Sequence, residues 1–480
     1  MEKPATLPLT DADWQQTPIA SQALIVALWD EVQQLRSDVA SLREQVQQTS
    51  HNSSRPPSSD PPSTPARKRG GSGRAAGGQP GHKGRGRTLL PIEQVDHVIA
   101  LKPSTCSSCG GFLAGDDAHP QRHQMTEVPL VHAQVTEYQV HTLRCSHCQG
   151  LTQADAPEGV LDSAFGPRVH ALVSLLSGAY RLSKRQIQAL LWDGFGVEMA
   201  VGTVSQLEQT ISQALAKPVD AAVAYVRQQQ AKNVDETGWR QQRRRAWLWT
   251  GVTRWVSVFV IRFSRGSKVV RDLLGDTIEG VVGSDRYSAY SFLPLSQRQI
   301  CWAHLRRDFQ KMVDRGGESK DLGEILSALT DQMFSWWHRV RDGTLKRTSF
   351  QRYLVDHKVR VHLYLWMGSQ CAHAQTARTC QEILAVEEAL WTFVGQAGVE
   401  PTNNAAERAL RHGVLWRKSS FGTHSEAGSR FVERVMTVVT TLRQQNRNVL
   451  TYLTQAGQAA GSGQPAPSLV PVRKRGDSLD

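Results

Sequence analysis

Hydrophobic residues near the start of the chain recur at alternating spacings of three and four positions. The series consists of Ile25, Leu28, Val32, Leu35, Val39, Leu42 and Val46. Such a series occupies the a and d positions of successive heptads, and Val or Ile at a with Leu at d favours a parallel dimer. Residues 20–49 are therefore predicted to form a coiled coil that makes the protein a homo-oligomer. The alternative is a single amphipathic helix that packs on its own protein.

The pattern becomes typical of strands after Lys232. Strands are predicted around Val234 and over residues 246–252, 255–261, 280–284 and 298–302, with helices over residues 267–274 and from Ala303. We interpret this succession as the order βββαβαβ within a mixed α/β domain over residues 230–455. An all-helical insertion over about residues 305–400 is expected before the last helix, with its tryptophans in a hydrophobic core.

Residues 160–225, which precede this domain, are predicted to be helical. One helix covers residues 183–192, residues 193–197 interrupt it, and another helix starts at Ala200. This arrangement is typical of a helix-turn-helix, whose second helix could enter a DNA major groove. Because the second helix carries few long basic side chains, a plain helical hairpin is equally compatible with the pattern.

Net charge points to a polyanionic partner. The 480 residues carry a formal charge of +12, and double-stranded DNA is the first candidate. Residues 50–97 are rich in Pro, Ser and Gly and are predicted to be a disordered arm. The arm's candidate phosphate contacts are Arg67, Lys68, Arg69, Arg74, Lys83, Arg85 and Arg87. A solvated linker is the alternative, and a second disordered segment is expected over residues 456–480.

Membrane and secretory segments are not expected in this sequence. No run of 18 apolar residues occurs, and the first residues lack a basic stretch followed by an apolar core. A cytoplasmic location is the resulting expectation.

Four of the seven cysteines form two Cys-x-x-Cys pairs within residues 98–155. The pairs are Cys106 with Cys109 and Cys145 with Cys148. Four thiolates at this spacing can bind one structural Zn²⁺ tetrahedrally, so a zinc-binding module is predicted. His123, His132, His141 and His147 are alternative ligands.

Three acidic residues occupy positions that suit phosphodiester chemistry. Asp235 is on the first predicted strand of the α/β domain, Asp285 follows the fourth, and Glu407 lies on a later helix. The strand order resembles the ribonuclease-H-like fold, in which the first and fourth strands are neighbours. Carboxylates placed together in this way can bind two Mg²⁺ or Mn²⁺ ions that act on a phosphodiester.

Each acidic residue also has a structural interpretation. Glu236 could face the site in place of Asp235, because strand alternation allows only one of them to do so. Asp285 could be an ordinary turn residue. Glu407 could complete a capping box with Asn404 at the start of its helix.

The chain resembles transposases of the insertion sequence 66 family. The similar segments are residues 52–60, 77–84, both Cys-x-x-Cys pairs, Asp-Glu-Thr at 235–237, Cys-Trp-Ala-His-Leu-Arg-Arg at 301–307 and residues 403–411. The resemblance implies a DDE transposase with Asp235, Asp285 and Glu407 as its triad. It also implies binding to the inverted repeats of a mobile element, and two small accessory proteins from the same element.

Cys301 and His304 match a signature found in transposases with helical insertions, which implies that they brace the sheet against the insertion. A non-catalytic, zinc-containing DNA-binding protein derived from a transposase is the alternative function. A nuclease that hydrolyses DNA without joining it is a third possibility.

Overall fold

A mixed five-stranded sheet lies at the centre of the chain. The computed structural model describes residues 2–49, 52–53, 88–156 and 163–471. The strands, in the spatial order β5-β4-β3-β6-β7, are β5 (Ser257–Arg262), β4 (Arg244–Val252), β3 (Ala231–Gln241), β6 (Val281–Ser284) and β7 (Arg298–Ile300). The first three strands are antiparallel, whereas β6 and β7 run parallel to β3. This is the mixed α/β core expected from the sequence, with first and fourth strands adjacent.

One predicted helix of the α/β order is absent from the described fold. Between β6 and β7 the chain forms only two 3-10 turns, η3 (Ser288–Tyr290) and η4 (Leu295–Gln297). The helix α7 (Ser267–Leu274), which connects β5 to β6, is present as expected. The parallel strands β6 and β7 are therefore connected by a compact segment of turns.

Helix α14 (Glu426–Gln444) closes the open edge of the sheet at β5. The backbone N–H groups of Ser257, Phe259 and Ile261 donate to side chains of α14. Their acceptors are Thr441, Thr437 and Glu433. Four helical residues rise about 6 Å and two strand residues about 6.6 Å, so the two spacings match along the contact. Buried donors of an edge strand are thereby satisfied without a sixth strand.

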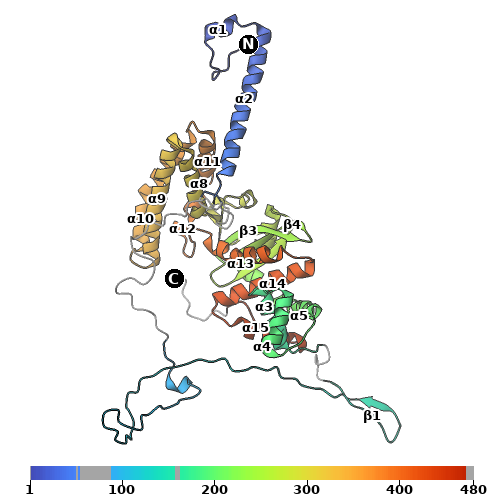
Figure 1. Ribbon diagram of the computed structural model, residues 1–480. Helices are drawn as coiled ribbons and strands as arrows, with labels where there is room; N and C mark the ends of the chain where they lie inside the picture. The colour runs from blue at the N-terminus through green and yellow to red at the C-terminus, as the bar shows by residue number, and fades with distance from the viewer. Residues whose placement is uncertain (1, 50–51, 54–87, 157–162, 472–480) are drawn as a thin grey trace.

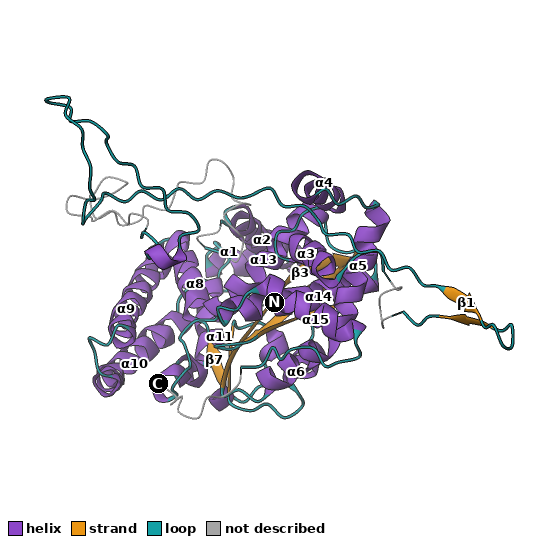
Figure 2. Ribbon diagram, turned by 90° about the horizontal axis from the view of Figure 1, so that it is seen from below, coloured by secondary structure: helices purple, strands orange, loops and turns teal. Residues whose placement is uncertain are grey.

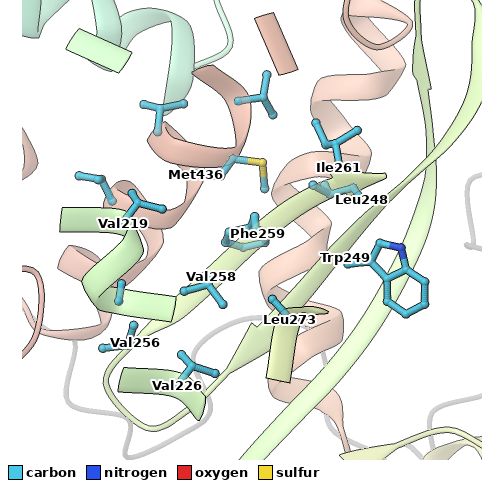
Figure 3. Packing of buried hydrophobic residues seen from close by; sticks show 14 of the residues in the cluster. Val219, Val226, Leu248, Trp249, Val256, Val258, Phe259, Ile261, Leu273 and Met436 are labelled. Atoms are coloured by element: carbon cyan, nitrogen blue, oxygen red, sulfur yellow. The ribbon is translucent and has the colours of Figure 1, made fainter. Parts of the chain in front are cut away.

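The helical region before the sheet shares one hydrophobic core with it. This region comprises α3 (Pro167–Gly178), α4 (Lys184–Phe195), α5 (Val201–Ala214) and α6 (Ala216–Arg227). Figure 3 shows Val219 and Val226 of α6 packing with strand residues such as Phe259, and with Met436 of α14. Helices α13 (Asn404–Ser420) and α15 (Val449–Gly461) complete the layer around these elements (Figure 1). Helices α3 and α5 also pack on α14 and α15, and α14 in turn packs on β5, so they support the sheet through α14.

An all-helical insertion separates β7 from α13. It consists of α8 (Trp302–Arg315), α9 (Gly317–Arg341), α10 (Arg347–Ser369), α11 (Ala374–Leu384), η5 (Glu387–Leu390) and α12 (Thr392–Gly395). Its hydrophobic core contains Trp337 and Trp391 and extends to Val281 of β6 and Ile300 of β7. Trp366 departs from the expected core role, because 54% of it is exposed on α10.

The N-terminal helix α2 (Ile19–Val46) follows the short helix α1 (Asp11–Gln16). Its heptad residues Leu28, Leu35 and Leu42 are exposed, so the predicted apolar stripe is not covered by the described part of this chain. Helix α2 contacts the insertion at its C-terminal end, where Glu44 accepts a hydrogen bond from Arg315 at 2.6 Å. Its other end stands away from the body of the molecule (Figure 1). The coiled coil itself remains a prediction.

Residues 88–156 follow an extended and mostly exposed path (Figure 2). Within it are the 3-10 turn η2 (Ile92–Gln94) and the hairpin of β1 (Thr142–Arg144) with β2 (Leu151–Gln153). No helix among the described residues is long and apolar enough to cross a membrane.

The C-terminal tail is ordered further than expected from its composition. Helix α15 extends to Gly461, and Leu469 is fully buried in the main core. The Tyr452 hydroxyl donates to the carbonyl of Pro467 at 2.6 Å, and the Gln445 amide donates to the carbonyl of Leu469 at 2.8 Å. The expectation of disorder from residue 456 is therefore wrong up to residue 471, because one leucine packs into the core.

Candidate active site

Asp235 lies on β3, and Asp285 directly follows the neighbouring strand β6. In the parallel pairing of β3 with β6, each β3 residue lies beside the β6 residue that is 50 positions later in the sequence. The last such pair is Asn233 with Gly283. Continued by two residues, this register places Asp285 beside Asp235. Asp235 is the fifth residue of β3, which continues to Gln241. At the position of Asp235, β6 has already ended, so no β6 residue pairs with β3 there.

Negative charges surround the carboxylate of Asp235. Burial raises its pKa well above the usual range, and the charges of Glu236, Asp285 and Glu407 raise the pKa further. A hydrogen bond from the backbone N–H of Glu236, at 2.9 Å, acts in the opposite direction. The three predicted acids are thus close enough to interact electrostatically.

Glu236 has its own cationic and hydrogen-bonding partners. One of its oxygens accepts two hydrogen bonds from Arg265, at 2.9 and 2.7 Å, and the other accepts one from the Tyr290 hydroxyl. Its side chain is only 2% exposed. Burial raises its pKa, whereas the bonds from Tyr290 and Arg265 lower it. A carboxylate satisfied in this way has a structural role, so Asp235 is the better candidate ligand of the pair.

Glu407 lies in the first turn of α13 and faces α8. One of its oxygens is 3.2 Å from an Arg307 nitrogen and 3.7 Å from Nε2 of His304. The N-cap residue of α13 is Asn403, and it makes no side-chain capping bond. The capping-box alternative with Asn404 is therefore not what this geometry shows. Glu407 is directed toward the site and away from its own helix terminus.

Cys301 and Asn403 join the three acidic segments. The backbone N–H of Cys301 donates to the carbonyl of Ser284, the residue before Asp285, at 2.9 Å. The Cys301 sulfur accepts the backbone N–H of Asn403 at 3.3 Å, at the start of the Glu407 helix. The Asn403 amide also reaches the carbonyl of Val234, the residue before Asp235, at 3.5 Å. Burial raises the pKa of the Cys301 thiol to about 12, so it is an uncharged structural group.

His304, the second residue of the Cys-x-x-His signature, lines a cavity of about 200 Å³ next to Asp285. Burial lowers the pKa of His304, and the nearby charge of Arg307 lowers it further. The remaining walls are formed by Ser53, Arg286, Tyr287, Arg307, Asp308 and Lys311. Acidic and basic side chains therefore line the cavity together, and Arg286 and Lys311 are each paired with Asp308.

The donor chemistry of the acids fits a divalent cation. Glu236 is paired with Arg265 and Glu407 with Arg307. Within the described part of the chain, the carboxylates of Asp235 and Asp285 accept backbone N–H groups and form no ion pair. Hard carboxylate oxygens of this kind are typical Mg²⁺ ligands. Within the described ranges, however, no three His, Cys, Asp or Glu side chains already converge as a metal site. Binding of a cation would therefore require the acids to rearrange.

The two Cys-x-x-Cys pairs have the same local fold but are not brought together. In each, the first cysteine accepts the N–H four residues later at 2.9 Å, and the residue there has positive φ: Gly110 at 72° and Gln149 at 60°. Backbone hydrogen bonds lower the pKa of Cys106 and Cys145. No three of the four thiols form a metal cluster in the described part of the chain. A single four-cysteine site is therefore not supported by this arrangement.

The other predicted DNA contacts, in the arm and in the helical region, stay predictions. The seven basic residues of the arm all lie outside the described residues. Helices α4 and α5 form where two helices were expected, with a capping box at Ser183 and Gln186 and a left-handed Gly196 that ends α4. Whether α5 enters a groove stays a prediction.

Arg307 and Asn403 were not among the site residues predicted from the sequence. Both lie inside motifs that were recognised, and the spacing of His304 and Arg307 on one helix is three residues. That spacing places two side chains on one helix face, which is the signal that could have identified Arg307. Asn403 had no comparable signal, because its partners are backbone atoms distant in the sequence.

Comparison with known proteins identifies the family of the chain. A family model described as the IS66 transposase family matches residues 163–430, and a family of unknown function, DUF6444, matches residues 11–88. Among relatives in Sinorhizobium fredii, the uncharacterized protein y4qI is 25% identical over 433 residues, which cover 82% of this chain and 78% of y4qI. The uncharacterized protein y4hP is 22% identical over 387 residues, or 72% and 69% of the two chains. Because the transposase model covers more than half of the sequence, the chain belongs to the IS66 family of DDE transposases, and this membership implies a transposase activity.

Proposed function

We propose that this protein binds the terminal inverted repeats of a mobile element and catalyses divalent-metal-dependent DNA cleavage and strand transfer. Asp235, Asp285 and Glu407 form its catalytic triad. The observation that supports the proposal is the register of β3 with β6, which, continued by two residues, aligns Asp235 with Asp285. Glu407 approaches them from α13, whose first turn is bonded to both strand segments through Asn403 and Cys301.

The three acids would hold two Mg²⁺ or Mn²⁺ ions. Such ions, when bound, stabilise the attacking and leaving oxygens of an in-line displacement at phosphorus. The protein's part is to fix the carboxylates: β3 holds Asp235, the end of β6 holds Asp285, and α13 brings Glu407. In strand transfer, the 3′-hydroxyl of the element forms a new bond to a target phosphorus and loses its proton to solvent. The bond from that phosphorus to the target 3′ oxygen breaks, and this oxygen takes up a proton and leaves as a 3′-hydroxyl.

The DNA-binding and assembly roles extend this proposal to other segments. The arm residues Arg67, Lys68, Arg69, Arg74, Lys83, Arg85 and Arg87 would contact phosphates, and helices α4 and α5 would help to grip the element ends. The exposed heptad stripe of α2 would join protomers in a coiled coil. The two accessory proteins implied by the family resemblance would act in the same assembly.

Zinc remains part of the proposal through the two cysteine turns. Their matching backbone geometry and their lowered thiol pKa values suit them to bind Zn²⁺ as thiolates. Residues 98–155 would then fold around one structural ion, and zinc would bring the two turns together.

A marker-transposition assay tests the proposed activity. The marker is flanked by the element's ends, the accessory proteins are present, and wild type is compared with Asp285→Ala. Movement in wild type that disappears in the variant is the expected result. Equal movement in both would place the active site elsewhere. Retained end binding without movement in either would favour a non-catalytic DNA-binding protein.

A further inference from the structure

Arg307 and Glu407 form an ion pair at the point where the acids would have to receive a cation. Arg307 is on α8 and Glu407 is on α13, and a guanidinium nitrogen of Arg307 is 3.2 Å from a carboxylate oxygen of Glu407. Arg307 also lines the cavity that contains Asp285. The Glu407 oxygen that would serve as a ligand is therefore bonded to a guanidinium.

The ion pair is not needed to hold α13 in place. The start of α13 is already fixed by Asn403, whose backbone N–H donates to Cys301. The preceding loop is fixed by a hydrogen bond from the Trp302 N–H to the carbonyl of Pro401 at 3.0 Å. The Arg307 side chain is 25% exposed and that of Glu407 is 32% exposed. A partly solvated pair of this kind adds little to stability, so stability alone does not explain its position.

Other arginines near the acids are held by different partners. Arg265 is bonded to Glu236, and Arg286 is bonded to Asp308 at 2.6 Å. Of these three arginines, Arg307 is the one that forms an ion pair with a proposed metal ligand, Glu407. If Glu407 turned toward Asp235 and Asp285, the guanidinium of Arg307 would remain in the cavity wall with a free positive charge.

We propose that Arg307 is a positioning residue that exchanges partners during the reaction. It pairs with Glu407 while the site is empty, is released when Glu407 ligates a divalent cation, and then binds a DNA phosphate in the cavity. This inference rests on the proposed function of the acids. It gives Arg307 two opposing effects, because the residue competes with the cation for Glu407 but strengthens DNA binding once the cation is present.

The chain contains a matched control for Arg307 in the preceding residue. Arg306 is on the same helix, but it pairs with Asp331 at 2.7 Å and does not line the cavity. Arg306→Gln and Arg307→Gln therefore change the net charge equally, and only Arg307→Gln removes the partner of Glu407.

Mn²⁺ binding to the full-length protein is the first measurement, by calorimetry and without DNA. We expect Arg307→Gln to bind Mn²⁺ about three- to tenfold more tightly than wild type, because a competing cation is removed. Arg306→Gln should match wild type, and Asp285→Ala should bind weakly. If Arg307→Gln bound Mn²⁺ no more tightly than wild type while Asp285→Ala lost affinity, the role of Arg307 would be wrong but the proposed metal site would stand. Equal binding by Asp285→Ala and wild type would overturn the proposed site as well.

The salt dependence of binding to a DNA duplex tests the second half of the exchange. With Ca²⁺ present, Arg307→Gln should lower the slope of log K against log salt by about 0.9, the loss of one phosphate contact. With chelator in place of Ca²⁺, the two slopes should agree, because Arg307 is then paired with Glu407. A slope difference that is the same in both conditions, or none in either, would contradict the exchange. If Arg307→Gln fails to fold, Arg307→Met allows the same comparison with the aliphatic stem retained.

Discussion

The sulfur of Cys301 accepts a hydrogen bond from the backbone N–H of Asn403 at 3.3 Å, across 102 positions of sequence. The backbone of Cys301 is bonded at the same time to Ser284, directly before Asp285. One buried residue thus links the strand that carries the second aspartate to the helix that carries the glutamate. The insertion enters the chain between these partners, so its α8 starts at the same point.

Replacement of Cys301 by alanine should impair both folding and catalysis. The change leaves the Asn403 N–H without its acceptor and creates a small cavity, so we expect a loss of about 1–3 kcal/mol in the free energy of unfolding. Strand transfer should fall more than DNA binding, because the position of Glu407 is disturbed. Thermal unfolding and strand-transfer rates measure the two effects. Cys301→Ser keeps an acceptor and should be milder than Cys301→Ala, and the reverse order would contradict this role.

Alanine at Asp235, Asp285 or Glu407 should abolish strand transfer and leave binding to the element ends intact. We expect losses on the order of a thousandfold or more, because each change removes a group that stabilises the charged transition state. Glu426→Ala is a matched control for Glu407→Ala. Glu426 also lies in the first turn of a helix, but it is exposed and away from the acids. Retained joining by any of the three variants would remove that residue from the triad.

Purified protein should contain one Zn²⁺ per chain, bound by Cys106, Cys109, Cys145 and Cys148. The zinc content of Cys106→Ser should fall sharply, whereas Cys371→Ser should retain it, since Cys371 is buried in the insertion. Zinc should also protect the four turn thiols from alkylation. Elemental analysis and alkylation followed by mass spectrometry give the two measurements. A full zinc content in Cys106→Ser would show that the metal is bound elsewhere.

Thr437 should be important for the edge of the sheet. Its hydroxyl accepts the N–H of Phe259 at 3.1 Å, and valine at this position would leave that buried donor unsatisfied. We expect Thr437→Val to cost about 1–3 kcal/mol of unfolding free energy. Thr440→Val is the matched control, because Thr440 is on the same helix but is more exposed than the buried Thr437. Similar unfolding midpoints for the two variants would show that α14 does not stabilise the edge in this way.

The stability of the insertion should fall in acid because of His357. Burial, together with the charge of Arg360, lowers the pKa of His357 to about 4. The unfolded chain takes up this proton near pH 6.5, so the stabilising contribution is complete above that pH and declines as pH falls toward 4. At pH 4 the loss approaches about 3 kcal/mol. His357→Phe should flatten the pH dependence of the unfolding temperature between pH 7 and 4.5, and an unchanged slope would refute the assignment.

The family resemblance, the sheet and the insertion could all be predicted from local sequence. Alternating apolar residues indicated the strands, and residues 301–307 and 403–411 carried recognisable motifs. The missing helix between β6 and β7 was a wrong prediction, because residues 288–297 form two single turns. The order of the tail was not predicted, because Leu469 is held by packing against core residues distant in the sequence and not by its sequence neighbours.

The sequence by itself determined which acids were candidates, because only Asp and Glu supply hard charged oxygens and their flanking residues predict strands and a helix. It could not determine which of Asp235 and Glu236 faces the site. That choice depends on Arg265 and Tyr290, which neutralise Glu236 from segments distant in the sequence. Only the tertiary structure revealed that Glu407 pairs with Arg307, since charge pairing depends on separation in space and the helical insertion brings α8 back against α13.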